Sequence, residues 1–170
     1  MRKRPKITAL VTGVALVATS SVFSPAVALE EFFAAKLRPG NEAAPVTLAT
    51  AGSGVFGALL DPSETSLSFE LHYNDLEGGT VTQAHIHLGQ PAISGGIVIH
   101  FCGSGGKPAC PSSAGVVTGI VTAADVVAVA AQGVAAGDFA KVIRAMRKGD
   151  TYFNVHTAGF PSGEIRGQIQ

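Results

Sequence analysis

The sequence has 170 residues but no tryptophan, only two cysteines, and charged residues at just 14% of the chain. It has no stripe of Lys and Arg that could neutralise phosphates, so we expect no nucleic-acid binding. It also lacks a Gly-x-Ser-x-Gly nucleophile elbow and a glycine-rich loop ahead of a helix, so neither a serine hydrolase nor a phosphate-cradling loop is indicated. No second long apolar run follows the N-terminal region, and we expect no membrane span in the mature chain.

The first 28 residues have the features of a secretory signal peptide. A positively charged start precedes an apolar run over residues 7–22, and residues 26–28 (Ala-Val-Ala) form a small-x-small cleavage site. Cleavage after Ala28 removes four of the 12 basic residues and none of the 12 acidic ones, which leaves 142 residues with a net charge of −4. We therefore expect a secreted or periplasmic protein with a single mature domain, residues 29–170.

Cys102 and Cys110 are the only thiols. In an exported protein an isolated pair favours a disulfide, and the seven residues between them, rich in glycine, suit a tight turn. A metal site built on both thiolates is the weaker alternative, because no further ligand lies at short spacing between or just after them.

Alternation of apolar and polar residues with a period of two dominates the mature chain. It predicts eight short strands, at residues 31–37, 53–60, 65–74, 81–88, 97–102, 115–122, 151–157 and 164–169. Two helical segments are expected as well. One starts at a capping pattern at Thr122 and runs to about Ala131, and the other starts at Asp138 and ends at Gly149. The pattern is typical of an all-β, antiparallel, Greek-key-like sandwich with one or two short helices.

The most informative motif is His85-Ile86-His87 in the fourth expected strand. Residues i and i+2 of a strand point to the same side, so both imidazoles leave one face while Ile86 enters the core. His156 lies on the polar face of the seventh strand. If these two strands are neighbours, the three histidines form a metal site that suits copper or zinc.

Two interpretations of the histidines stay open. In one, they bind a single copper or zinc ion, with His100 as a candidate fourth ligand. In the other, they are hydrogen-bonded groups in a fixed polar network that holds loops in place.

Asn154, Glu164 and Arg166 are the further candidates for that network. Glu164 and Arg166 share a strand face two residues apart, so they can pair side by side or each bind groups of a neighbouring strand. We favour the first alternative, a buried or edge-covering ion pair that fixes strand register. Gly167 between the strands would permit a close approach. We assign no catalytic residue, because the sequence indicates no substrate cleft for Glu164 to serve as a general base.

Two motifs carry a resemblance to a known family: the stretch from Ala84 to Gly89, and the segment 152–157 together with Gly163-Glu164-Ile165-Arg166-Gly167-Gln168-Ile169. In this order they resemble the CHRD domain family, the module named after chordin, over most of the mature chain. The resemblance implies an exported β-sandwich. It suggests a binding or structural role rather than an enzyme, with an unknown protein or a metal ion as partner.

A second, fainter likeness is to copper/zinc superoxide dismutase, in which a His-x-His strand faces a later Val-His. His85, His87 and His156 match that pattern in type and order, but the bridging histidine and the zinc loop have no counterpart. The likeness therefore implies a mononuclear copper or zinc site, with redox activity as a further hypothesis.

Overall fold

The computed structural model describes residues 30–43 and 48–170. The expected signal peptide, residues 1–28, lies outside this part of the chain. No helix among the described residues combines the length and the apolar character that crossing a membrane requires.

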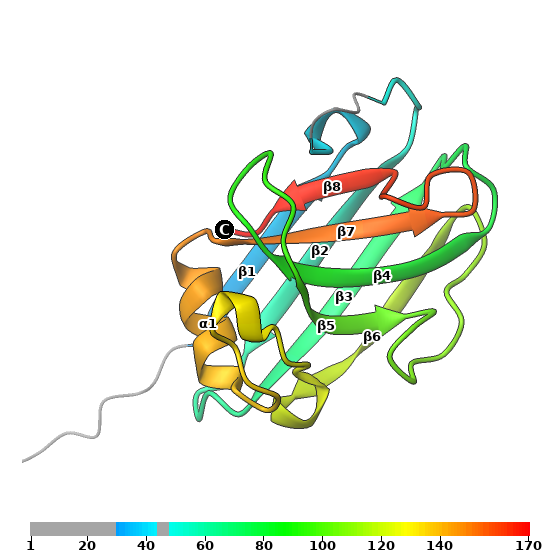
Figure 1. Ribbon diagram of the computed structural model, residues 1–170. Coiled ribbons are helices and arrows are strands. Elements are labelled where there is room, and N and C mark those ends of the chain that lie inside the picture. The colour runs from blue at the N-terminus through cyan, green and yellow to red at the C-terminus, as the bar shows by residue number, and fades with distance from the viewer. Residues whose placement is uncertain (1–29, 44–47) are drawn as a thin grey trace, which may run out of the picture.

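Eight strands form two four-stranded antiparallel sheets that pack face to face (Figure 1). The first sheet has the order β1-β2-β3-β6 and the second β5-β4-β7-β8. The strands are β1 (Glu31–Leu37), β2 (Ser53–Leu60), β3 (Ser66–Asn74), β4 (Val81–Leu88), β5 (Ile97–Cys102), β6 (Gly115–Thr122), β7 (Thr151–Thr157) and β8 (Ile165–Gln168). All eight predicted strands are thus confirmed, and so is the sandwich.

Alternation along the strands builds the core between the sheets, as in β3, where buried and exposed residues alternate throughout. Four phenylalanines fill its centre. Phe56 stacks on Phe153 with ring centroids 4.4 Å apart, and Phe69 meets Phe101 edge-on at 4.6 Å. Burying such rings is a major apolar contribution to the stability of a small domain.

The two sheets also join along one side, where β1 runs beside β8. Backbone hydrogen bonds link Ala34 with Gln170 and Arg38 with Arg166 in both directions. A Cβ atom at Gly167 would lie 2.4 Å from the carbonyl oxygen of Lys36. The predicted close approach at Gly167 is therefore confirmed.

The helix α1 (Phe139–Arg147) lies at one end of the sandwich, and Asp138 caps it by accepting a hydrogen bond from the Lys141 amide. The other predicted helix is wrong. Thr122 does begin a capping box, but the helix stops after the single 3-10 turn Ala123–Asp125. The β-branched residues that follow extend the second sheet instead, because the Val127 amide donates to the carbonyl oxygen of Val98 on the edge strand β5.

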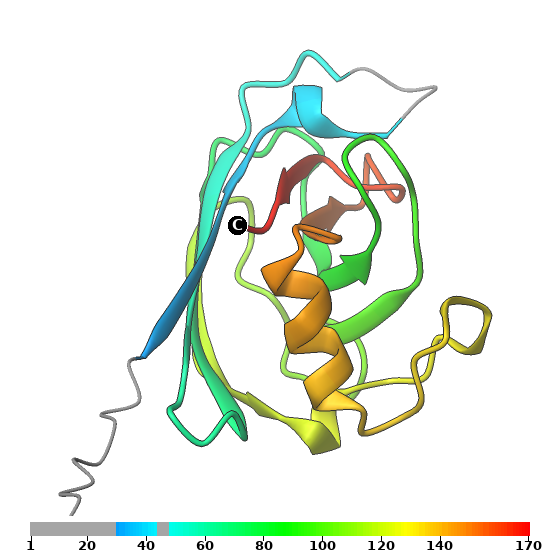
Figure 2. The same cartoon turned by 90° about the vertical axis from the view of Figure 1, so that its left-hand side faces the viewer.

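The two sheets differ in what covers their outer faces. Figure 2 shows the first sheet edge-on, with no other described segment over its outer side. Every residue of β7 is buried, as are the last five of β4, so the second sheet is covered on both faces. Polar side chains on the outer face of β4 and β7 are consequently held away from water.

Candidate functional site

His85, His87 and His156 come together on the outer face of the second sheet. The strands β4 and β7 are neighbours, with His85 opposite Asn154 and Gln83 opposite His156. One nitrogen from each of the three imidazoles lies within 4.8 Å of the others, and all three side chains are buried. The convergence expected from the sequence is therefore present.

Hydrogen bonds to backbone carbonyls fix the protonation pattern of two of these rings. Nδ1 of His87 lies 2.9 Å from the Gly95 carbonyl oxygen, and Nδ1 of His156 lies 3.0 Å from that of Pro161. A carbonyl oxygen can only accept, so each Nδ1 carries the proton and each Nε2 holds a lone pair.

The protonation of the His85 ring follows from that of His87. His85 Nδ1 is 2.9 Å from His87 Nε2, so His85 Nδ1 donates to that lone pair. His85 Nε2 and His156 Nε2 are then lone pairs, and both atoms are buried without a hydrogen-bond partner. Buried polar atoms without partners are uncommon in folded proteins, which sets these two nitrogens apart from most other buried polar groups of the domain.

Burial keeps the cluster neutral. Desolvation is the main cause that lowers the pKa of His85 to about 2 and that of His87 to about 4, with repulsion from neighbouring histidines adding to it. Desolvation also lowers the pKa of His156, against the opposing effect of its bond to Pro161. Neutral imidazole is the form that ligates metals.

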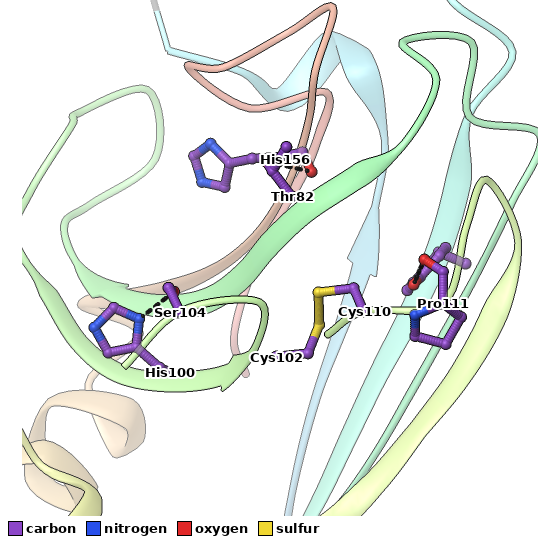
Figure 3. Close-up of a disulfide and its surroundings, with 8 residues drawn as sticks. Thr82, His100, Cys102, Ser104, Cys110, Pro111 and His156 are labelled. Carbon is purple, nitrogen blue, oxygen red and sulfur yellow. Dashed lines mark hydrogen bonds between the residues drawn. A yellow bond between two sulfur atoms is a disulfide. The ribbon is translucent and has the colours of Figure 1, made fainter. Parts of the chain in front are cut away.

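His100 lies beside this cluster but outside the set of three converging nitrogens. Its ring meets that of His85 edge-on, with centroids 5.4 Å apart. Its Nδ1 is hydrogen-bonded to the Ser104 hydroxyl at 2.7 Å (Figure 3). The proposed role of His100 as a fourth ligand therefore stays a prediction.

A cavity of about 400 Å³ opens next to the histidines. His87 and His156 line it and His85 does not, so two of the three imidazoles face the space. Its other lining residues come from β7, β8 and three loops: Glu42, Ala43, Leu48, Ser94, Gly95, Tyr152, Asn154, Gly159, Phe160, Pro161, Ser162, Gly163 and Arg166. This volume is in the range of small-molecule sites.

Comparison with known protein families decides where the chain belongs. The family model of the CHRD domain matches residues 33–169, which is most of the chain. The chain belongs to the CHRD domain family. No curated protein and no solved structure matched it. The fainter likeness to copper/zinc superoxide dismutase therefore stays a prediction.

Arg166 closes one side of the cavity of this CHRD domain. Its guanidinium lies over the Tyr152 ring, with Cζ 3.4 Å from the ring centroid, and Tyr152 in turn stacks on the His87 ring at 4.7 Å. Nη2 of Arg166 donates to the carbonyl oxygens of Gln90 and Ile93 at 3.0 and 2.9 Å. Arg166 thereby ties the loop after β4 to the histidine cluster.

The predicted ion pair between Glu164 and Arg166 is wrong, because the two side chains bind different partners. Glu164 is fully buried and accepts hydrogen bonds from the Glu77 and Gly78 amides and from the Thr157 hydroxyl. It precedes β8, where the chain leaves the loop, and so it reaches the turn after β3 and not the cavity. Three donors satisfy this carboxylate without a cation.

Glu42 is the cavity residue that the sequence analysis did not single out. Its Oε1 accepts from Nδ2 of Asn154 at 2.7 Å, and Asn154 also donates to the Ile165 carbonyl oxygen. Desolvation raises the pKa of Glu42 to about 7, against the lowering effects of Asn154 and Arg166. A lone acid in a loop has no period, so the alternation of apolar and polar residues could not have indicated it.

The predicted disulfide between Cys102 and Cys110 is present (Figure 3). It closes the loop that follows β5, and the Gly103 amide donates to the Pro108 carbonyl oxygen across that loop. Ser104, the partner of His100, lies within the same loop. The disulfide therefore supports the edge of the sheet next to the histidine cluster.

Proposed function

We propose that this CHRD domain is an exported binding module and that the cavity beside His87 and His156 is its binding site. The observation that carries the proposal is the covered outer face of the second sheet, where the cavity meets two buried imidazoles, a buried guanidinium and a half-buried carboxyl. Polar groups that converge on an enclosed space of this size are the usual mark of a ligand site.

Export is part of this proposal. A disulfide is stable in oxidising compartments, and the sequence over residues 1–28 has the pattern of a cleavable signal. Mass spectrometry of the protein recovered from a secreting host tests this directly. A mature N-terminus at Leu29 supports export, and an intact chain retained in the cytoplasm contradicts it.

Binding at the cavity is tested by NMR of residues 29–170 with a library of small acids, amines and neutral aromatics. The expected result is a set of amide shifts confined to the loops around the cavity, which the Gly95, Gly159 and Gly163 amides report. Gly106, in the disulfide loop, is the reference amide. Shifts absent from the cavity loops across the whole library would overturn the proposal.

A copper or zinc ion is the second candidate ligand, and the two lone pairs without partners favour it. Histidines that ligate metals almost always donate the other ring N–H to a carbonyl or carboxylate. His87 and His156 already do so through Gly95 and Pro161. The donor set therefore fits a borderline or imidazole-preferring metal. Redox activity is a further hypothesis that depends on this ion.

Elemental analysis and titration calorimetry with zinc and copper, on tag-free residues 29–170, separate the two candidates. One equivalent bound by the wild type and lost in His87→Ala supports the metal. His72→Ala is the matched control, because His72 is exposed on the first sheet. Metal uptake unchanged by His87→Ala, or no uptake at all, contradicts the metal and leaves the histidines as a fixed polar network.

A further inference from the structure

Arg166 is a buried cation that has no salt bridge to a carboxylate of the described residues. It is 2% exposed, and no Asp or Glu in the described parts of the chain forms a salt bridge with it. Within the described parts of the chain, only the Nη2 group of Arg166 forms hydrogen bonds, and its two acceptors are backbone carbonyl oxygens. Burying a charge is costly unless it is paired, so an anion beside this guanidinium would be strongly favoured.

The rest of the cavity does not supply that anion at or below neutral pH. Its three titratable side chains other than Glu42 and Arg166 are His87, His156 and Tyr152. A histidine side chain is neutral or positively charged, so neither imidazole supplies a negative charge. Glu42 is the only carboxyl among the described lining residues, and because desolvation raises its pKa to about 7 it is protonated in a large part of the population.

The residues that line the cavity indicate which chemical groups, besides an anion, a ligand would need. Leu48, Phe160 and Pro161 contribute an apolar side, and Arg166 lies with Asn154 on the sheet that forms the floor. An apolar wall with one cation suits a small ligand with one charged end, and it does not suit a multiply charged phosphate ester.

We propose that the cavity binds a small organic monocarboxylate, with the carboxylate at Arg166 and the apolar body against Leu48, Phe160 and Pro161. This deepens the proposed function, on which it rests, by naming the ligand class of the same cavity. The Nε and Nη1 groups of Arg166, which are not hydrogen-bonded to the described residues, are the donors available to the carboxylate.

Binding is coupled to a proton on Glu42. An incoming carboxylate repels the ionised form of Glu42 and leaves the protonated form unaffected, so the complex takes up a proton. Asn154 and Arg166 lower the pKa of Glu42, against the larger effect of desolvation. Burial lowers the pKa values of the neighbouring His87 and His156 as well. Affinity for the anion therefore falls as pH rises above 7.

Calorimetry with benzoate and benzamide on metal-free residues 29–170 tests the ligand class. The two probes have nearly the same shape, and only benzoate is charged. We expect benzoate to bind at pH 6 at least 10-fold more tightly than benzamide. Arg166→Lys should weaken the binding of benzoate. Arg144→Lys, on the exposed side of α1, should leave the Kd for benzoate unchanged.

Glu42→Gln provides a gain in affinity that a damaged fold cannot imitate. It should remove the pH dependence and bind benzoate about 10-fold or more tightly than the wild type at pH 8.5. Equal affinity for benzamide and benzoate overturns the anion proposal and leaves the binding module standing. If neither benzoate nor benzamide binds, the anion proposal is overturned as well. The NMR screen with the compound library then tests separately whether the domain is a binding module.

Discussion

The Nδ1–H of His156 donates a hydrogen bond to the carbonyl oxygen of Pro161 at 3.0 Å, which leaves Nε2 of the same ring as a buried lone pair without a partner. The bond is local, since His156 lies near the end of β7 and Pro161 lies five residues later, in the loop that follows. The loop thus sets the tautomer of a side chain on the sheet. The same relationship recurs between His87 and Gly95 across the loop after β4.

This pattern predicts the tautomers in solution. In metal-free protein at pH 7.5, His87 and His156 should both carry the proton on Nδ1, because a carbonyl oxygen offers no proton in return. Long-range 15N–1H NMR of the imidazoles measures this directly. A proton on Nε2 of His156 would contradict the geometry and remove the argument for an unpartnered lone pair.

Buried neutral histidines make the metal-free domain sensitive to acid. Their folded-state pKa values lie below the unfolded value of about 6.5, so on acidification the unfolded chain takes up protons first. Stability is therefore full above pH 6.5 and falls toward pH 4, by about 1.4 kcal/mol per pH unit for each such histidine. Urea unfolding between pH 7.5 and 4.5 should show a shallower loss of stability in His87→Gln than in the wild type. Equal slopes in the two proteins would refute this.

Glu164 is expected to be among the costliest side chains to remove. Glu164→Ala leaves two partly buried amides and one buried hydroxyl without an acceptor, so we expect the free energy of unfolding to fall by about 3–5 kcal/mol. Glu31→Ala, which breaks an exposed ion pair with Arg147, should cost at most about 1 kcal/mol. Similar losses in the two variants, measured by chemical denaturation, would show that the Glu164 bonds matter little.

The disulfide should make a modest contribution to the free energy of unfolding. Replacing both Cys102 and Cys110 by Ala is expected to lower the free energy of unfolding by about 2–3 kcal/mol, because the closed loop is short. Lys107→Ala serves as a comparison, because it leaves the bridge intact and removes only the ion pair between this loop and Asp125 in the 3-10 turn after β6. If reduction of the wild type leaves its urea midpoint unchanged, the bridge does not stabilise the fold.

A comparison of alanine substitutions at Gly163 and Gly133 separates the cost of backbone strain from the cost of crowding in the cavity. Its φ is +121°, and an added Cβ would lie 2.5 Å from Nδ2 of Asn154 and 2.8 Å from Oε1 of Glu42. Gly133 also has a positive φ, yet a Cβ there meets nothing within 4 Å. Gly133→Ala should cost about 1 kcal/mol and Gly163→Ala about 2–3 kcal/mol, with benzoate binding weakened only in the latter. Equal thermal unfolding temperatures for the two variants would contradict the crowding.

Local periodicity was enough to predict the strands, because each strand has an apolar side that the core requires. It failed after Thr122, where the capping box is real but Val127 gains more from pairing with β5 than from continuing a helix. The histidine spacing predicted which rings share a face. Their convergence depended on β4 and β7 being neighbours, which one sequence does not encode locally.

Contacts between residues that lie far apart in the sequence could not be predicted either, because they also depend on how the strands are arranged. Glu42 meets Asn154 across 112 positions of sequence, and Glu164 meets Glu77 across 87. Neither contact leaves a periodic trace. Residue type and spacing can propose that Glu164 and Arg166 pair, but only the fold shows that each has nearer partners.

The central strands β4 and β7 are covered on both faces, while the outer face of the first sheet is open. Amide hydrogens of β4 and β7 should therefore exchange with solvent only through global opening, more slowly than those of β1 or β6. The imidazoles are attached to the part of the molecule that opens last. A ligand would thus meet a site already in its bound shape, and the ordering that binding still requires falls to the surrounding loops.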